Sequence, residues 1–127
     1  MSTASQEATL YTRLGGYDAI AAVADNLLGR LMADSQLGRC WKDRARDSIC
    51  REKQLLIEFL CASAGGPAFY MGRDMVTAHR GMGLSQSDWS VFLGHLQATL
   101  AHFNVPDRER GDVLGFVESL KKDIVEK

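Results

Sequence analysis

A ten-residue stretch that is unsuited to a helix interrupts a sequence with helical patterning elsewhere. From Gly65 to Asp74 the chain carries three glycines and one proline, which are residue types that end helices and support loops. The segments on either side keep their apolar residues at three- and four-residue spacing, and no strand-like alternation appears. The sequence therefore predicts an all-α fold with one long loop held between two helices.

Apolar periodicity predicts four longer helices. They cover residues 18–32, residues 48–64, the segment that follows Ser85, and a last helix that opens at Pro106 or Asp107 and continues to Ile124. Ser85 and Asp107 are predicted to cap their helices. A chain of 127 residues, 46% of them hydrophobic, supplies one core and one domain, 1–127, in which 1–8 is expected to be a flexible N-terminal segment. A plain four-helix bundle fits the same pattern, but the glycine-rich loop disfavours it.

Charge and cysteine content exclude several classes of protein. The formal net charge is −1, and no basic run is present, so we expect no binding to nucleic acid or to a membrane. The polar N-terminus lacks the apolar core of a secretion signal, which predicts a cytoplasmic location. Cys40, Cys50 and Cys61 are odd in number and lack CxxC spacing, so they are predicted to be reduced thiols rather than a disulfide framework or a zinc site.

One histidine falls on an apolar helical face directly after the loop. On a helix, Met75, Val76, His79 and Met82 share one sector, and His79 is near its middle. An imidazole in such a place needs a partner, which is either a metal such as haem iron or a backbone carbonyl. From these residues alone, two interpretations stay open: an iron ligand, or a structural histidine in a cofactor-free helical interaction module.

Five phrases along the chain occur in an order and spacing similar to those of the truncated haemoglobins. They are LYTRLGGYDAI (10–20), LMADSQLGRCW (31–41), FLCASAGGPAFYMGR (59–73), MVTAHRGM (75–82) and HLQATL (95–100). The chain resembles group I of this family from Leu10 to Ile124, because Phe92 stands where groups II and III typically carry tryptophan. The resemblance implies a two-over-two helical sandwich, in which two antiparallel helix pairs cross. Its glycine pairs match Gly15-Gly16 and Gly65-Gly66.

The same resemblance implies haem b (iron protoporphyrin IX) as the cofactor. His79 matches the residue that binds the iron, Met75 matches a residue packed against the porphyrin, and Trp41 matches an aromatic that wedges the haem. The other residues expected to contact the haem are Leu28, Glu52, Lys53, Leu56, Phe59, Leu60, Tyr70, Arg73 and Phe92. Arg51, Lys53 and Arg73 are candidates to pair with the haem propionates, because cationic side chains suit carboxylates. His95 and His102 are expected to face away from the haem.

The ligand side of the expected pocket departs from the group I pattern. Leu28 aligns with a tyrosine that donates a hydrogen bond to bound oxygen, while Glu52 and Leu56 align with glutamines. The diatomic ligands oxygen, carbon monoxide and nitric oxide would therefore meet an apolar pocket. We expect redox, nitric oxide or peroxide chemistry, or gas sensing, rather than oxygen storage. Nitric oxide dioxygenase-like activity, peroxidase-like activity, a reductase partner, Glu52 as a proton donor and Lys53 as a sixth iron ligand stay open.

Overall fold

The computed structural model describes residues 8–126. Its helices are α1 (Leu10–Leu14), α2 (Gly16–Ala33), α3 (Arg46–Ser63), α4 (Met75–His79), α5 (Gln86–His102), α6 (Asp107–Glu118) and α7 (Lys121–Ile124), with the 3₁₀ helix η2 (Gly38–Trp41) between α2 and α3. The described residues contain no strand, so the all-α prediction is confirmed. The N-terminal segment expected to be flexible lies, apart from Ala8, outside the described residues.

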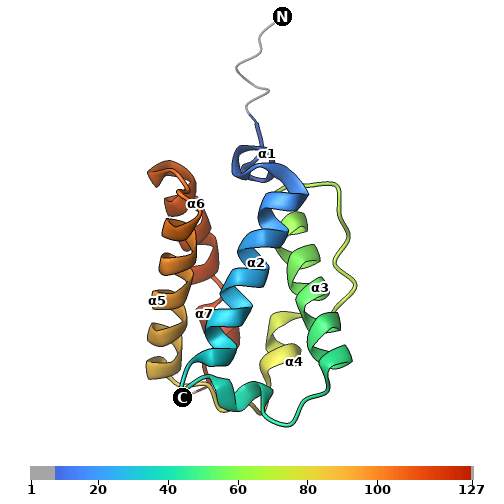
Figure 1. Cartoon of the computed structure of the whole chain (residues 1–127), viewed down its shortest axis with the longest axis vertical. Helices are drawn as coiled ribbons and strands as arrows, with labels where there is room; N and C mark the ends of the chain where they lie inside the picture. The colour runs from blue at the N-terminus through green and yellow to red at the C-terminus, as the bar shows by residue number, and fades with distance from the viewer. Residues whose placement is uncertain (1–7, 127) are drawn as a thin grey trace, which may run out of the picture.

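Two antiparallel helix pairs form the body of the molecule. Figure 1 shows α2 and α3 running in opposite directions as one pair, and α5 and α6 as the other. Helix α2 contacts both α3 and α5 and so joins the pairs. This arrangement is the predicted two-over-two sandwich. Among residues 8–126, no helix has the length and hydropathy that a membrane span requires.

The apolar core forms where α2 meets the other long helices. One cluster joins α2, α5 and α6 through buried residues that include Leu27, Leu31, Leu96, Leu100 and Val117. A second joins α2 to α3 through Ile20, Ala24, Ile57 and Cys61. Residues three or four apart share a helix face, and each large apolar side chain so buried contributes roughly 1.5 to 3 kcal/mol. The core therefore fixes the long helices and leaves α4 outside it.

The predicted caps have different outcomes. Ser85 Oγ accepts from the Asp88 amide at 3.1 Å, and the Asp88 carboxylate accepts from the Ser85 amide at 2.9 Å, which is a complete capping box. The Asp107 cap was predicted wrongly. Pro106 occupies that position, and its backbone angles already turn the chain into α6, so Asp107 becomes the first helical residue. There its negative charge still suits the helix N-terminus.

Three helix boundaries also differ from the predictions. Helices α2 and α3 begin two residues earlier than expected, at Gly16 and Arg46, and the last helix is interrupted between α6 and α7. Helix α4 ends at His79, because Gly81 and Gly83 adopt left-handed backbone angles (φ 84° and 67°) that no helix contains. The predicted helical stripe around the histidine is therefore shorter. Val76 and Met82 are each 39% exposed.

The loop from Gly65 to Asp74 is fixed at its start by the first helix. The Tyr11 amide donates to the Ala64 carbonyl at 2.9 Å, and a side-chain carbon placed on Gly66 would lie 2.3 Å from the Tyr11 ring. Only glycine permits this close approach. The loop then leaves the end of α3 and returns to α4 along the side of the molecule (Figure 1).

Candidate functional site

A cavity of about 760 Å³ lies between the helix pairs. Among the residues predicted to contact a bound group, all except Lys53 line it: Leu28, Trp41, Glu52, Leu56, Phe59, Leu60, Tyr70, Arg73, Met75, His79 and Phe92. Most of these side chains are apolar, and they come from α2, η2, α3, the following loop, α4 and α5. The fold thus gathers residues from distant parts of the sequence around one space.

His79 presents one ring nitrogen that has no hydrogen-bond partner among residues 8–126. Its Nδ1 lies 2.9 Å from the carbonyl oxygen of Met75, one helical turn earlier. A carbonyl can only accept a hydrogen bond, so this contact assigns the proton to Nδ1 and leaves the lone pair on Nε2. The same bond fixes the ring orientation. His79 therefore lines the cavity with an oriented Nε2 that can coordinate a metal.

The other two histidines do not line the cavity. His95 Nε2 lies 2.7 Å from Asp34 Oδ2, and the hydrogen bond from His95, with two backbone amides, lowers the pKa of the Asp34 carboxyl. The His102 ring packs edge-on against Phe103, with centroids 4.9 Å apart. Within residues 8–126, no three His, Cys, Asp or Glu side chains gather to hold a metal ion.

One side of the cavity, which we call the distal wall, is formed by Leu28 from α2 with Leu56 and Phe59 from α3. Leu28 is 5% exposed. The Phe59 ring meets the edge of the Tyr70 ring, with centroids 5.1 Å apart. None of the three wall side chains carries a hydrogen-bond donor. A small polar ligand at this wall receives no hydrogen bond from it.

Glu52 closes part of the cavity mouth together with two donors. Trp41 Nε1 donates to Glu52 Oε1 at 3.2 Å, and Arg44 Nη1 lies 2.6 Å from Oε2. The Glu52 and Arg44 side chains are about a third exposed. Both carboxylate oxygens of Glu52 therefore act as acceptors. The Trp41 N–H is already used in this arrangement.

Lys53, unlike the other residues predicted to contact the haem, does not line the cavity. Its Nζ forms an ion pair with Asp25 Oδ1 at 3.0 Å, and the hydrogen bond to Asp25 raises the pKa of the Lys53 ammonium. The reason is helical geometry. One residue beyond Glu52, the side chain points about 100° around the helix, toward α2 instead of the cavity.

Two arginines lie at the cavity rim. Arg51 and Arg73 both line the cavity and are exposed, and neither guanidinium has a recorded partner within residues 8–126. The loop beside Arg73 is held by Tyr70, whose hydroxyl donates to the Arg73 carbonyl at 2.5 Å. Burial raises the pKa of the Tyr70 phenol. Two guanidinium groups at one rim suit a bound group with carboxylates at its edge.

A buried donor in the cavity lining, Trp89, was missed by the sequence analysis, which did not name it among the residues expected to contact the haem. Trp89 is 4% exposed and lines the cavity, yet its Nε1–H has no hydrogen-bond partner among the described residues. An unsatisfied buried donor costs about 1 to 3 kcal/mol. The sequence carried a signal for this donor, because a buried tryptophan usually needs a hydrogen-bond acceptor for its N–H group. A bound group with polar edges, such as haem, fits this donor and the rim arginines.

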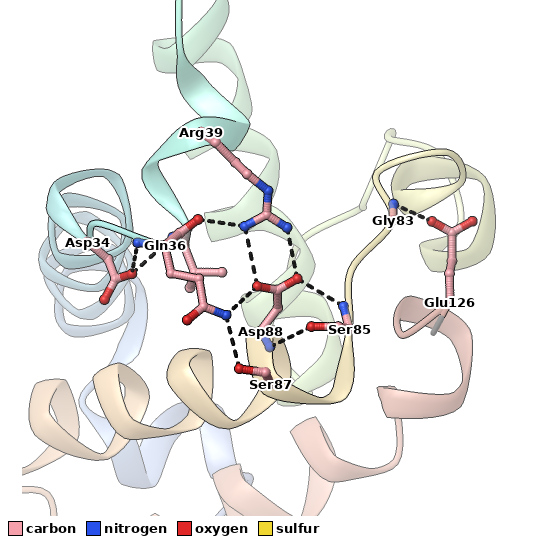
Figure 2. A network of polar contacts seen from close by, with 9 residues as sticks. Asp34, Gln36, Arg39, Gly83, Ser85, Ser87, Asp88 and Glu126 are labelled. Carbon is pink, nitrogen blue, oxygen red and sulfur yellow. Dashed lines mark hydrogen bonds and ion pairs between the residues drawn. The ribbon is translucent and has the colours of Figure 1, made fainter.

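A buried carboxylate connects the two sides of the cavity. Asp88 accepts from Arg39 Nη2 at 2.8 Å, from Gln36 Nε2 at 2.6 Å and from the Ser85 amide at 2.9 Å (Figure 2). The Arg39 guanidinium is the main cause that holds the Asp88 pKa well below its usual range. Arg39 belongs to η2, which also carries Trp41, whereas Ser85 ends the loop that follows His79. Asp88 thus ties both cavity-bearing segments to α5.

Known proteins show the same sequence pattern and the same fold. The family model described as bacterial-like globin matches residues 9–126. The chain is 31% identical to the group 1 truncated hemoglobin GlbN of Mycolicibacterium paratuberculosis over 94% of this chain and 86% of that protein. It is 28% identical to the group 1 truncated hemoglobin of Tetrahymena thermophila over 96% of this chain and 98% of that protein.

The structural comparison agrees. The crystal structure of the Fe(III) form of truncated hemoglobin from Tetrahymena pyriformis superposes with a TM-score of 0.85 at 28% identity, and covers 94% of this chain and all of that chain. Family pattern, whole-chain identity and superposed fold thus coincide. This protein belongs to the bacterial-like globins, as a group I truncated haemoglobin, and is a haem-binding globin.

Proposed function

We propose that the cavity binds haem b, that His79 Nε2 is the axial iron ligand, and that diatomic ligands bind against the distal wall. The observation that carries this proposal is the 2.9 Å hydrogen bond between His79 Nδ1 and the Met75 carbonyl, which leaves Nε2 on a cavity-lining side chain. Haem, when bound, supplies an iron that takes up diatomic gases and exchanges electrons.

The chain's own residues orient and enclose that group. Met75 and Phe92 supply apolar contacts from α4 and α5, while Arg51 and Arg73 at the rim are placed to pair with propionates. Trp89 Nε1 supplies a further buried donor. Together these residues fix the orientation of the haem and keep water from its apolar faces.

The distal wall decides which chemistry is favoured. A donor that hydrogen-bonds a partly charged oxygen ligand contributes about 1 to 3 kcal/mol to holding it, and Leu28, Leu56 and Phe59 supply none. Oxygen is then held weakly, and the iron oxidises readily. We therefore propose redox, nitric oxide or peroxide chemistry, or gas sensing, as the role, in preference to oxygen storage. We further propose that a reductase supplies electrons to the iron and that the protein is cytoplasmic.

Absorption spectroscopy of the purified protein tests the assignment. The wild type is expected to show an intense Soret band, and ferrous protein with carbon monoxide is expected to show a histidine-ligated spectrum. His79→Ala removes the axial nitrogen, so this spectrum should be lost, and added imidazole should restore it. His102→Ala is the matched control, because that ring packs on Phe103 outside the cavity. A His79→Ala spectrum identical to the wild type would contradict the proposal.

A further inference from the structure

We propose that Glu126 is a positioning residue for His79. Its carboxylate holds the loop that follows the histidine and thereby sets how the imidazole is presented to the iron. This inference rests on the proposed function, because it assigns His79 as the iron ligand. Glu126 is remote in sequence from every residue predicted to contact the haem.

Three hydrogen bonds connect Glu126 to the loop. Its Oε2 accepts from the Gly81 amide at 3.0 Å, and its Oε1 accepts from the Gly83 amide at 2.7 Å. In addition, the Glu126 amide donates to the Leu84 carbonyl at 2.9 Å. Figure 2 shows the carboxylate reaching the Gly83 amide from the C-terminal end of the chain. Both carboxylate oxygens and the backbone of one residue thus hold residues 81–84.

The two glycines are built to receive an anion. Gly81 and Gly83 adopt φ values of 84° and 67°, a left-handed conformation that favours glycine. Backbone amides that turn toward one point in this way form a nest, which binds negatively charged oxygens. Because the acceptor is a carboxylate, these hydrogen bonds are of the stronger, charge-assisted kind. The GMG sequence after His79 and Arg80 therefore matches the carboxylate that occupies it.

The contact matters for His79 because the short segment that bears it is otherwise held mainly by the contact between α4 and α7. Helix α4 has five residues and none of them is buried, while the Met82 amide donates to the His79 carbonyl at 3.2 Å and joins histidine to loop. Gly81 lies two residues from His79. At the end that joins α5, the loop is fixed by the hydrogen bond that the Ser85 amide donates to the Asp88 carboxylate. Glu126 therefore holds the backbone that directly follows the proposed iron ligand.

The iron–histidine stretching band in the resonance Raman spectrum of deoxygenated ferrous protein tests this role. Glu126→Ala removes both acceptors, and Glu126→Gln keeps the size but presents an amide donor to one of the two N–H groups. Both variants are expected to shift and broaden the band. The hydrogen-exchange rate of the Gly81 and Gly83 amides should rise about tenfold, since each lost hydrogen bond is worth about 1.4 kcal/mol. Glu118→Gln, on the exposed surface of α6, is the matched control and should leave both readouts unchanged.

The outcomes are separable. A band that keeps its position and width in both haem-loaded Glu126 variants overturns the positioning role, as does unchanged exchange at both glycines. Absence of any iron–histidine band in the wild type would instead contradict the assignment of His79, and so the proposed function. If Glu126→Ala does not retain haem, Glu126→Gln provides the comparison alone.

Discussion

The two sides of the cavity are held in place by different kinds of interaction. The distal wall belongs to α2 and α3, two helices of 18 residues whose buried faces pack on each other. The opposite side consists of α4, five residues without a buried member, and of the loop that Glu126 and Asp88 fix through backbone amides. The distal wall thus depends on apolar packing between long helices, whereas the side that bears His79 depends on the contact between α4 and α7 and on a few charge-assisted hydrogen bonds.

This difference separates two kinds of mutational effect. A substitution in the distal wall changes what a ligand touches and leaves the helices in place. A substitution of Asp88 or Glu126 changes the stability or geometry of the segment that bears His79. The predictions below test this division, beginning with the largest expected effect.

Asp88→Asn should lower the free energy of unfolding by about 2 to 3 kcal/mol at pH 7, because it weakens buried hydrogen bonds to Arg39 and Gln36. The folded state lowers the Asp88 pKa. Its ionised form therefore stabilises the fold above the unfolded pKa of about 4, and this contribution is lost as the pH falls. The difference between the two proteins should shrink below about pH 4. Denaturant unfolding at pH 7 and pH 3 measures it.

Asp43→Asn is the matched control for that experiment. Asp43 is exposed and has a positive φ of 62°, which asparagine tolerates. Its effect should stay within about 0.5 kcal/mol. Equal stability losses in the two variants, or a difference that grows in acid, would show that Asp88 does not act through the proposed hydrogen bonds.

Leu28→Tyr should slow oxygen dissociation from the ferrous protein by about 3- to 10-fold. The phenol would supply one hydrogen bond, and a typical hydrogen bond is worth about 0.5 to 1.5 kcal/mol. Stopped-flow displacement of oxygen by carbon monoxide measures the rate. Leu28→Phe adds the ring without the hydroxyl and is the matched control. If the phenylalanine variant slows dissociation as much as the tyrosine variant, crowding rather than hydrogen bonding is the cause.

Lys53→Ala should leave the ferric absorption spectrum unchanged between pH 6 and pH 10. The wild-type ammonium is paired with Asp25, which raises its pKa, and it lies away from the cavity. The amine is therefore not available to the iron. A wild type that becomes low-spin as the pH rises, with Lys53→Ala failing to do so, would make the lysine a ligand after all.

The difference between the distal wall and the segment that bears His79 also explains how much the sequence could predict. Leu56 and Phe59 were expected at the haem from the family resemblance, and both line the cavity because a long helix repeats its geometry at each turn. His79 was found because it follows a loop signal and matches a family pattern. Lys53 was expected at the haem because the alignment fixed its position in the sequence, while its pairing with Asp25 depends on how α2 and α3 are placed.

The long-range polar contacts that hold the segment bearing His79 could not be predicted from the sequence. Asp88 and Ser85 form a local capping box that spacing reveals, but the bonds from Arg39 and Gln36 join residues about fifty positions apart. Glu126 meets Gly81 across 45 positions. Such pairs carry no periodic signal, because each depends on one side chain that reaches one backbone group. The glycines after His79 were visible, but the anion that they receive was not.

The short helix α4 also has a consequence for how the chain opens. Met75, Ala78 and His79 line the cavity, and α4 contacts α7 without joining the core of the four long helices. Segments with few buried contacts unfold locally at a lower cost than the whole chain. A group that binds only the closed segment adds its binding free energy to that local equilibrium. For α4, a bound haem would then add local order to that which the contact with α7 provides.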